Sequence, residues 1–345
     1  MSMMRGVLKR IGWLAVYVLG LVALVFAGAW VWWQPEPEAR GTEVNALWAR
    51  HQWVGEEHTE DEYRAFARLL RENRITDVYF HAGPFEPNGS VPPAKYRNAG
   101  KLIAAMRRHA PDVRPQAYLG QIRKVDGYGL VDLDDRAVRE TVLKTDMIFL
   151  DLGFAGIHYD FEPIYHDDQG FLTLLDETRA LTRPRGRLLS VAIEQLTTVD
   201  ALQPVYKALL PRGWGRAHYP PRPTRDFLTK IADRADQVAI MTYDVGLPTR
   251  SLAGLHFAWH TEQTLRLIGD RTTVFIGVPT YRPSMDWAED LPGALRGVRR
   301  GLDALDRPPA RPYGVGVYAD WTTSPAEWAR YRATWLPRAP ANVGG

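Results

Sequence analysis

The chain has 345 residues, of which 46% are hydrophobic, and its formal net charge at neutral pH is only +3. This size and hydrophobic content allow a full core and fit a single α/β barrel, which typically needs about 250 residues. Because basic residues form no run longer than a pair and cysteine is absent, the composition disfavours nucleic acid as a partner and excludes disulfides and thiolate metal sites.

The first predicted element is an uncharged apolar segment at residues 11–33. At about 1.5 Å per helical residue it is long enough to cross a hydrocarbon core of about 30 Å, so we expect a transmembrane helix. Arg5, Lys9 and Arg10 precede the segment, and the first charged residue after it is Glu36. The positive-inside rule therefore leaves the N-terminus in the cytoplasm and the rest of the chain outside it, in the periplasm or the extracellular space.

Three tryptophans near the end of this segment bear on whether it is retained. Trp30, Trp32 and Trp33 lie where an interfacial aromatic belt is expected, which favours an uncleaved anchor. The small residues at 27–29 keep a cleavable signal peptide as the alternative. With either interpretation, the domain that follows is exported.

The predicted organisation has five parts. These are a cytoplasmic N-terminus at 1–10, a transmembrane anchor at 11–33, a linker at 34–42, one domain at 43–338 and a C-terminal tail at 339–345.

Within the domain, short apolar runs alternate with amphipathic stretches. Eight predicted strands that alternate with eight predicted helices indicate a (β/α)8 TIM barrel, whose functional site lies at the carboxyl ends of the strands. Strands are expected at residues 43–50, 77–83, 113–120, 155–162, 188–195, 237–244, 273–280 and 313–320. Helices are expected at residues 59–74, 95–110, 135–149, 171–182, 224–234, 251–268, 291–305 and 324–334.

The fourth predicted strand ends in two acids. Alternate side chains of a strand share a face, so His158, Asp160 and Glu162 are expected to point the same way. Two carboxylates this close do not ionise independently, and one pKa is usually raised, which suits Glu162 to act as a general acid. The alternative is that these acids cap the next helix or pair with arginines.

The other strand ends carry aromatic and polar groups. Flat aromatic faces surrounded by carboxylates suit a sugar, whose ring presents C–H groups on its faces and hydroxyls at its rim. For each single aromatic residue, ordinary packing at the barrel rim is the alternative. We find no convincing cluster of His, Cys and carboxylate residues that would bind a metal ion.

Three segments resemble family 18 glycoside hydrolases, the chitinase-like enzymes. Residues 156–162 (Gly-Ile-His-Tyr-Asp-Phe-Glu) resemble the fourth-strand signature of that family, D-G-x-D-x-D-W-E. Residues 241–244 (Met-Thr-Tyr-Asp) are similar to the sixth-strand M-x-Y-D, and residues 277–282 to the seventh-strand G-x-P-x-Y-G/R, while Trp321 falls near the eighth-strand tryptophan. The resemblance runs in chain order over about residues 43–335.

This resemblance implies retaining hydrolysis assisted by the substrate. In that family an acid protonates the glycosidic oxygen, while the 2-acetamido carbonyl of the substrate attacks the anomeric carbon. Glu162 matches the acid, Asp160 the residue that stabilises the oxazolinium ion, and Tyr243 the hydroxyl that contacts the acetamido oxygen. The chemistry needs no cofactor.

The resemblance and the strand ends together give a set of substrate-binding residues. Asp244 and Tyr281 match positions that line the subsites, and Trp321 matches the platform under the distorted sugar. The full expected set is His158, Asp244, Tyr281, Arg282, Trp321, Trp48, Tyr118 and Glu194.

The chain also departs from the family pattern. Ala155 and His158 replace the first two aspartates, so the proton shuttle that serves Asp160 is missing. A cationic His158 would lower the pKa of Asp160, whereas a neutral one would only form hydrogen bonds. Glu194 is an additional carboxylate that would suit a nucleophile in a two-carboxylate mechanism, although a hydrogen-bonding or structural role is favoured.

One insertion, at residues 211–222, follows the fifth strand and so is expected on the functional face. Its aromatic residues suit either an additional subsite wall or a rigid surface cover.

Three functions remain open from the sequence. The favoured one is a membrane-anchored glycoside hydrolase that acts on a polysaccharide or oligosaccharide containing N-acetylhexosamine. The others are a two-carboxylate hydrolase of neutral sugars and a non-catalytic glycan-binding barrel.

Overall fold

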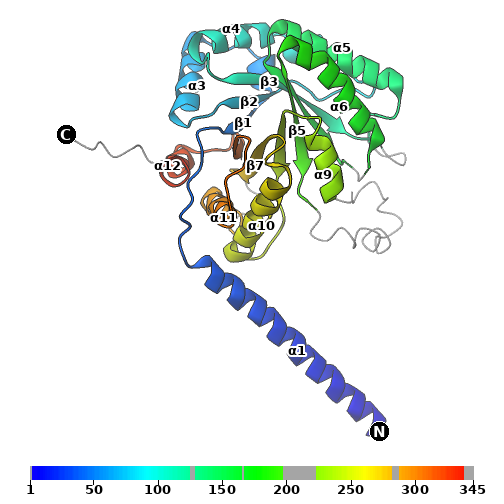
Figure 1. Cartoon of the computed structure of the whole chain (residues 1–345), viewed down its shortest axis with the longest axis vertical. Coiled ribbons are helices and arrows are strands. Elements are labelled where there is room, and N and C mark those ends of the chain that lie inside the picture. Colours follow the sequence, from blue (N-terminus) through cyan, green and yellow to red (C-terminus); the bar gives the residue numbers. More distant parts are fainter. Residues whose placement is uncertain (1, 125–128, 165–166, 197–222, 282–286, 338–345) are drawn as a thin grey trace, which may run out of the picture.

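The computed structural model describes residues 2–124, 129–164, 167–196, 223–281 and 287–337. Within this part of the chain, parallel strands form a closed barrel in the order in which they occur in the sequence (Figure 1). The strands are β1 (Ala46–Ala49), β2 (Asp77–His81), β3 (Arg114–Ile122), β4 (Gly156–Glu162), β5 (Leu188–Glu194), β6 (Gln237–Met241), β7 (Thr273–Pro279) and β8 (Tyr313–Tyr318).

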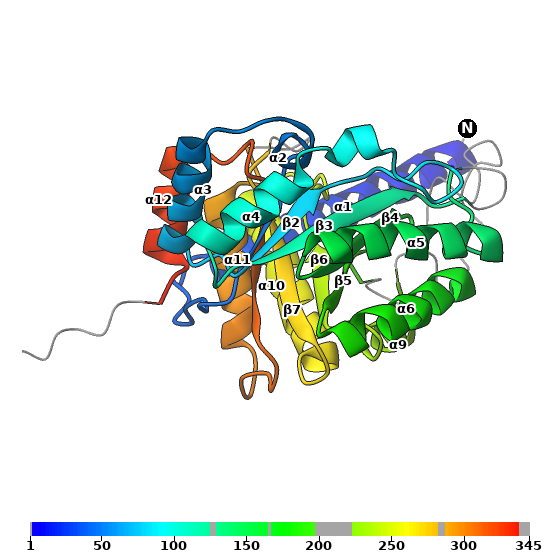
Figure 2. The ribbon, with the colours of Figure 1, turned by 90° about the horizontal axis from the view of Figure 1, so that it is seen from above.

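Helices follow the strands and form the outer layer of the barrel (Figures 1 and 2). Several of these helices have an amphipathic sequence and begin at a residue that caps the helix N-terminus. At the start of α3, for example, Thr59 and Glu62 form a capping box. The main helices are α3 (Glu60–Glu72), α4 (Ala99–His109), α5 (Arg136–Leu152), α6 (Gln169–Thr182), α9 (Arg225–Ala232), α10 (Arg250–Ile268), α11 (Leu291–Asp303) and α12 (Pro325–Thr334). Shorter turns of helix are α2 (Gln52–Gly55), η1 (Pro93–Tyr96) and η2 (Arg183–Arg185).

The predicted TIM barrel is confirmed. Each predicted strand overlaps one of β1 to β8, and each predicted helix overlaps one of the main helices. The alternation was readable because the strands of a parallel barrel are buried on both faces and form apolar runs, whereas the covering helices bury only one side.

Strand β4 divides its side chains between the two sides of the barrel wall, as its alternation predicts. Ile157, Tyr159 and Phe161 point outward into the core between the wall and the helices. His158 lies inside, where its ring contacts Tyr79. Asp160 and Glu162 continue the inward series toward the carboxyl end of the strand.

The opposite end of the barrel is closed by a buried polar cluster. The carboxylate of Asp77 is not exposed, and its Oδ1 accepts hydrogen bonds of 2.9 Å from the side-chain amides of Gln116 and Gln237. Arg114 pairs with the other oxygen at 2.6 Å. These residues lie at the amino ends of β2, β3 and β6, so the described interior is filled below the acids of β4.

Helix α1 (Ser2–Trp33) precedes the barrel and projects away from it beside α10 and α11 (Figure 1). Its residues 13–33 are long and apolar enough to cross a membrane, with a mean hydropathy of 2.4, and the exposed side chains there include Leu14, Leu19 and Leu24. Gly41 and Thr42, which fall in the predicted linker, hydrogen-bond to the carbonyls of Trp335 and Tyr313.

Candidate active site

Two acids at the end of β4 form the centre of the candidate site. Asp160 and Glu162 lie on the same face of the strand, two residues apart, and each shifts the pKa of the other. Glu162 reaches solvent at the end of the barrel, whereas Asp160 is half-buried beneath it. The predicted pair of adjacent carboxyl groups is therefore present.

The surroundings keep Glu162 protonated at neutral pH. Desolvation is the main cause, and the negative charges of Asp160 and Glu194 add to it, so that the pKa of Glu162 is raised to about 9. Burial also raises the pKa of Asp160, an effect that its hydrogen bond with Tyr118 opposes. The arrangement supplies a carboxylic acid that can donate a proton at pH 7.

Tyr118 on β3 holds the inner acid. Its hydroxyl donates a hydrogen bond of 2.5 Å to Oδ2 of Asp160. Gly120, two residues further along β3, allows this close approach of the strands, because a Cβ there would lie 2.1 Å from the backbone oxygen of Asp160. Asp160 is thus held by Tyr118 from the neighbouring strand.

His158 lies one layer deeper and is not exposed. Its ring stacks on Tyr79 with 3.6 Å between centroids, and its Nδ1 is 2.8 Å from Oγ of Ser190. Burial lowers the pKa of His158 well below its ordinary value, so the ring is neutral. Of the two roles considered from the sequence, the structure favours the one without a positive charge beside Asp160, and the burial of His158 does not favour contact with substrate.

Aromatic rings from three strand ends gather beside the acids. Tyr318 at the end of β8 lies 5.4 Å from Tyr243 and 5.5 Å from Tyr281, between ring centroids. Burial first, and then the charges of Asp160 and Glu162, raise the pKa of Tyr318. Trp321 is 39% exposed and meets Tyr318 edge-on at 5.5 Å.

Tyr318 was absent from the predicted set, although it falls within the eighth predicted strand. Trp48, by contrast, was predicted to contact substrate but is only 1% exposed. Its ring packs inside the barrel, 5.8 Å from Tyr318 and 5.1 Å from Tyr79. Trp48 therefore lies beneath the site, and the alternation of β1 explains why, because this side chain points inward at a deeper level than the strand ends.

Two further glutamates hold loops at the rim. Oε1 of Glu194 accepts a hydrogen bond of 3.2 Å from the backbone N–H of Ile164, just after β4. Glu289 is 2% exposed and accepts hydrogen bonds from the backbone N–H groups of residues 244–246, at 2.7 to 3.0 Å. Asp244, predicted to bind substrate, is exposed at this turn with φ of 58°. Sequence reasoning missed Glu289 because it lies in a loop well after β7.

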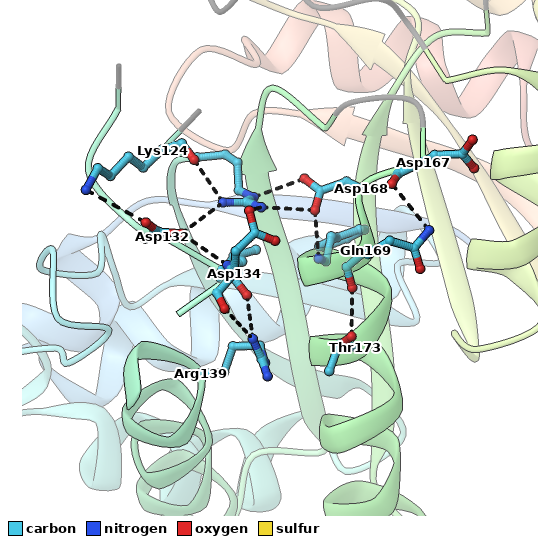
Figure 3. A network of polar contacts seen from close by, with 11 residues as sticks. Lys124, Asp132, Asp134, Arg139, Asp167, Asp168, Gln169 and Thr173 are labelled. Carbon is cyan, nitrogen blue, oxygen red and sulfur yellow. Dashed lines mark hydrogen bonds and ion pairs between the residues drawn. The ribbon is translucent and has the colours of Figure 1, made fainter. Parts of the chain in front are cut away.

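An ion-pair network around a buried arginine supports the end of β4 (Figure 3). Arg123 is 3% exposed and binds both oxygens of Asp168, at 3.0 and 3.1 Å, as well as Asp134 at 3.1 Å. Asp168 also caps α6 by accepting from the backbone N–H of Phe171 at 2.9 Å. Because the backbone N–H of Arg123 donates to the carbonyl of Glu162 at 2.8 Å, the network fixes the position of the outer acid.

Three predictions fall outside the described residues, namely Arg282, the insertion at 211–222 and the C-terminal tail at 339–345. Across the part of the chain that the structure describes, no group of three or more His, Cys, Asp or Glu side chains is arranged to hold a metal ion.

Comparisons with solved structures identify the same fold elsewhere. The spore cortex-lytic enzyme SleL of Bacillus cereus superposes with a TM-score of 0.57 at 12% identity, over 87% of this chain and 76% of that one. A class V chitinase from Pseudomonas fluorescens Pf-5 gives a TM-score of 0.54 at 14% identity, over 86% of this chain and 99% of that one. A chitinase from Chromobacterium violaceum gives 0.52 at 13% identity, over 85% and 98%.

These similarities establish a shared barrel fold. No protein-family model matches the chain, and no curated protein matches it significantly in sequence.

Proposed function

We propose that the chain is a glycoside hydrolase of the chitinase-like family 18 kind, which cleaves glycans containing N-acetylhexosamine. The single observation that carries the proposal is the pair of neighbouring acids, Asp160 and Glu162, on one face of β4 at the carboxyl end of the barrel, with the pKa of Glu162 raised to about 9. The motifs on β4, β6 and β7 and the barrel shared with a cortex-lytic enzyme and two chitinases add support.

The proposed reaction uses the acetamido group of the substrate as the nucleophile. Glu162 donates its proton to the glycosidic oxygen while the carbonyl oxygen of the 2-acetamido group attacks the anomeric carbon, so the glycosidic bond breaks and an oxazolinium ion forms. Asp160 stabilises the positive charge of that ion, and the hydroxyl of Tyr243 binds the acetamido oxygen. Water then attacks the anomeric carbon, returns a proton to Glu162 and yields a product of retained configuration.

Tyr118 takes over part of the work that the missing aspartates do in the family. With Ala155 and a neutral His158 below it, Asp160 has the Tyr118 hydroxyl at 2.5 Å as its donor from the neighbouring strand. A carboxylate that accepts such a bond stays oriented toward Glu162 and the acetamido group. On this proposal the orienting group is a tyrosine on β3 and not an acid on β4.

The two-carboxylate alternative receives less support. Glu194 engages the backbone N–H of Ile164 and acts on Glu162 through its charge, which suits a loop-holding residue. Without a second acid assigned to attack, the acetamido group is the nucleophile we favour.

We also propose that α1 is a single-pass anchor that leaves the barrel outside the cytoplasm. The exposed apolar surface of residues 13–33 supports an anchor. A signal peptide is the competing interpretation, and the two differ in whether Trp13 and its neighbours persist in the mature protein. Mass spectrometry of the protein extracted from membranes distinguishes them.

The activity is tested with the full-length protein in detergent. Labelled oligosaccharides of N-acetylglucosamine and of glucose are compared with the wild type, with Glu162→Gln and with Glu72→Gln, an exposed glutamate at the end of α3, which lies at the opposite end of the barrel. The proposal predicts hydrolysis of the acetylated substrate by the wild type and by Glu72→Gln only. Binding of both oligosaccharides without cleavage of either would favour a glycan-binding barrel instead.

A further inference from the structure

The segment that joins α1 to the barrel is fastened along the outside of α11. Both carboxylate oxygens of Asp303 accept hydrogen bonds from the backbone N–H groups of Glu38 and Ala39, at 2.9 and 2.6 Å. Arg299 donates to the carbonyls of Pro37 and Ala39. The chain therefore does not leave the anchor as a free tether; it is bound at successive residues.

The end of α1 is clamped as well. The guanidinium of Arg296 lies 4.5 Å above the ring of Trp33 and donates to the backbone carbonyl of that residue at 2.7 Å. Arg300 lies 4.4 Å above the ring of Trp32. Trp33 also presses against Gly254 of α10, where a Cβ would lie 2.0 Å from the ring, so this glycine is needed for the contact. Cation–π stacking combined with hydrogen bonding holds the helix end in one orientation. We call these contacts of Trp32 and Trp33 with Arg296, Arg300 and Gly254 the clamp.

The contacts give the direction of α1 relative to the barrel. In a parallel barrel α10 and α11 begin at the carboxyl ends of the strands, the end that carries Asp160 and Glu162. Trp33 meets Gly254, within α10, whereas a cavity of about 710 Å³ is lined by α1 from Phe26 to Trp33, by residues 249–251 at the start of α10, and by Trp287. From Trp33 back to Phe26, α1 therefore extends toward the active-site end of the barrel.

The connecting segment runs the other way. It passes Arg296, then Arg299 and Asp303 further along α11, and then reaches the carbonyl of Tyr313 at the start of β8 through Thr42. The barrel thus extends from the clamp in one direction and the exposed part of α1 in the other. The apolar residues of α1 before Phe26 lie beyond the active-site end of the molecule.

The rim near α1 has the composition of a membrane interface. Trp287 is 55% exposed and Trp30 is 60% exposed, and both line the cavity, with Arg250 beside them. Tryptophan and arginine are the side chains that favour the headgroup region at the end of a spanning helix.

We propose that the clamp between α1 and α10/α11 holds the active-site end of the barrel toward the bilayer, with Trp287 at the lipid surface. The substrate is then a glycan attached to that same membrane through a lipid. This inference about substrate class rests on the proposed function, whereas the orientation does not. A clamped anchor presents the site at a fixed height and angle, so it raises the effective concentration for membrane-attached glycans in a way that a loose linker would not.

The orientation of the barrel relative to the bilayer can be measured without an assay of enzymatic activity. The chain has no cysteine, so single cysteines can be labelled with a fluorophore in the full-length protein in phosphatidylcholine vesicles that contain a headgroup nitroxide lipid. Pro248→Cys reports the rim after β6, and Asp112→Cys the opposite end before β3; both positions are exposed. We expect several-fold stronger quenching at 248 than at 112. Equal quenching, or stronger quenching at 112, would overturn the orientation.

The substrate class is measured with one oligosaccharide in two forms. Chito-oligosaccharide is supplied free in solution or attached to a lipid in the same vesicles, and wild type is compared with the double variant Arg296→Ala, Arg300→Ala. Arg271→Ala, which removes an exposed ion pair with Asp233 remote from the clamp, is the control.

We expect the double variant to lose several-fold of its rate on the lipid-attached form and none on the free form, while the control matches the wild type on both. Equal rate ratios in all three proteins would overturn the assignment of a membrane-attached substrate. Hydrolysis of neither form by the wild type, with asymmetric quenching retained, would overturn the proposed function and leave the orientation standing.

Discussion

The hydroxyl of Tyr118 on β3 donates a 2.5 Å hydrogen bond to Oδ2 of Asp160 on β4, the acid two residues before Glu162 on the same face of the strand. This contact joins two neighbouring strands at the site and supplies the inner acid with an orienting partner. It is also the contact through which the missing family aspartates are compensated in our proposal.

Tyr118→Phe removes that donor and keeps the ring. A hydrogen bond to a charged group contributes about 1.5–3 kcal/mol, which corresponds to roughly a 10- to 100-fold fall in kcat with little change in KM. Steady-state kinetics on an acetylated substrate measure the effect. Tyr96→Phe, a half-buried tyrosine outside the site, is the matched control, and a Tyr118→Phe enzyme as fast as this control would contradict the orienting role.

The charge of Glu194 sets part of the alkaline limit of activity. Glu162 must be protonated to act as an acid, so kcat falls as the pH rises through its raised pKa of about 9. Glu194→Gln removes one of the negative charges that raise this pKa, so the alkaline limb should move to lower pH while most of the activity below it remains. Loss of activity at every pH, as severe as in Glu162→Gln, would instead make Glu194 a nucleophile.

A buried carboxyl outside the site makes stability depend on pH. Asp146 on α5 is fully buried, accepts a hydrogen bond from the hydroxyl of Tyr159, and has its pKa raised by desolvation from 3.8 to about 8. Because the folded-state pKa lies above the unfolded one, the proton stabilises the fold fully below about pH 4, and this contribution is lost as the pH rises toward 8.

Asp146→Asn cannot titrate, so its free energy of unfolding should vary less over this pH range than that of the wild type. The variant should lose a pH dependence of the free energy of unfolding of up to about 1.4 kcal/mol per pH unit, which is the value for a single proton. Denaturant unfolding in detergent, followed by tryptophan fluorescence at several pH values, measures it. Asp151→Asn, at an exposed position of the same helix, should leave the slope unchanged. An equally steep slope in Asp146→Asn would exclude Asp146 as its source.

Arg123 positions Glu162 through the backbone and the start of α6. Arg123→Ala leaves Asp168 buried without its partner, and removing one member of a buried ion pair costs about 3–5 kcal/mol of stability. Arg123→Lys keeps the charge but loses the two-pronged contact, so we expect a folded enzyme whose kcat falls while KM changes little. Arg136→Ala, which breaks an exposed pair with Glu140, is the control and should resemble the wild type. A Lys variant with wild-type kcat would restrict Arg123 to a structural role.

The sequence was informative where a periodic pattern fixes geometry. Alternation placed Ile157, Tyr159 and Phe161 on one face of β4 and His158, Asp160 and Glu162 on the other, and apolar runs located every strand of the barrel. The sequence did not predict how deep in the barrel each inward-pointing side chain lies. Trp48 and Tyr318 both point inward, yet one is buried and the other borders the acids, because strand tilt and stagger decide the level that each side chain reaches.

The alternation pattern of the strands also could not predict contacts between different loops. Glu289 lies in the stretch between β7 and α11 and binds backbone groups of residues 244–246, which belong to a different loop. Likewise the protonation state of His158 depends on its burial against Tyr79 and its contact with Ser190, both supplied by other strands.

The most direct test varies the nucleophilicity of the acetamido group. Hydrolysis by the full-length enzyme is compared on one glycoside that carries N-acetyl, N-fluoroacetyl or N-trifluoroacetyl at the 2-position, since each fluorine withdraws electrons from the attacking carbonyl oxygen. Substrate assistance predicts a steep, stepwise fall in kcat/KM along this series and no activity in Glu162→Gln. A rate that is the same for all three substrates would contradict the mechanism proposed for Asp160 and Glu162.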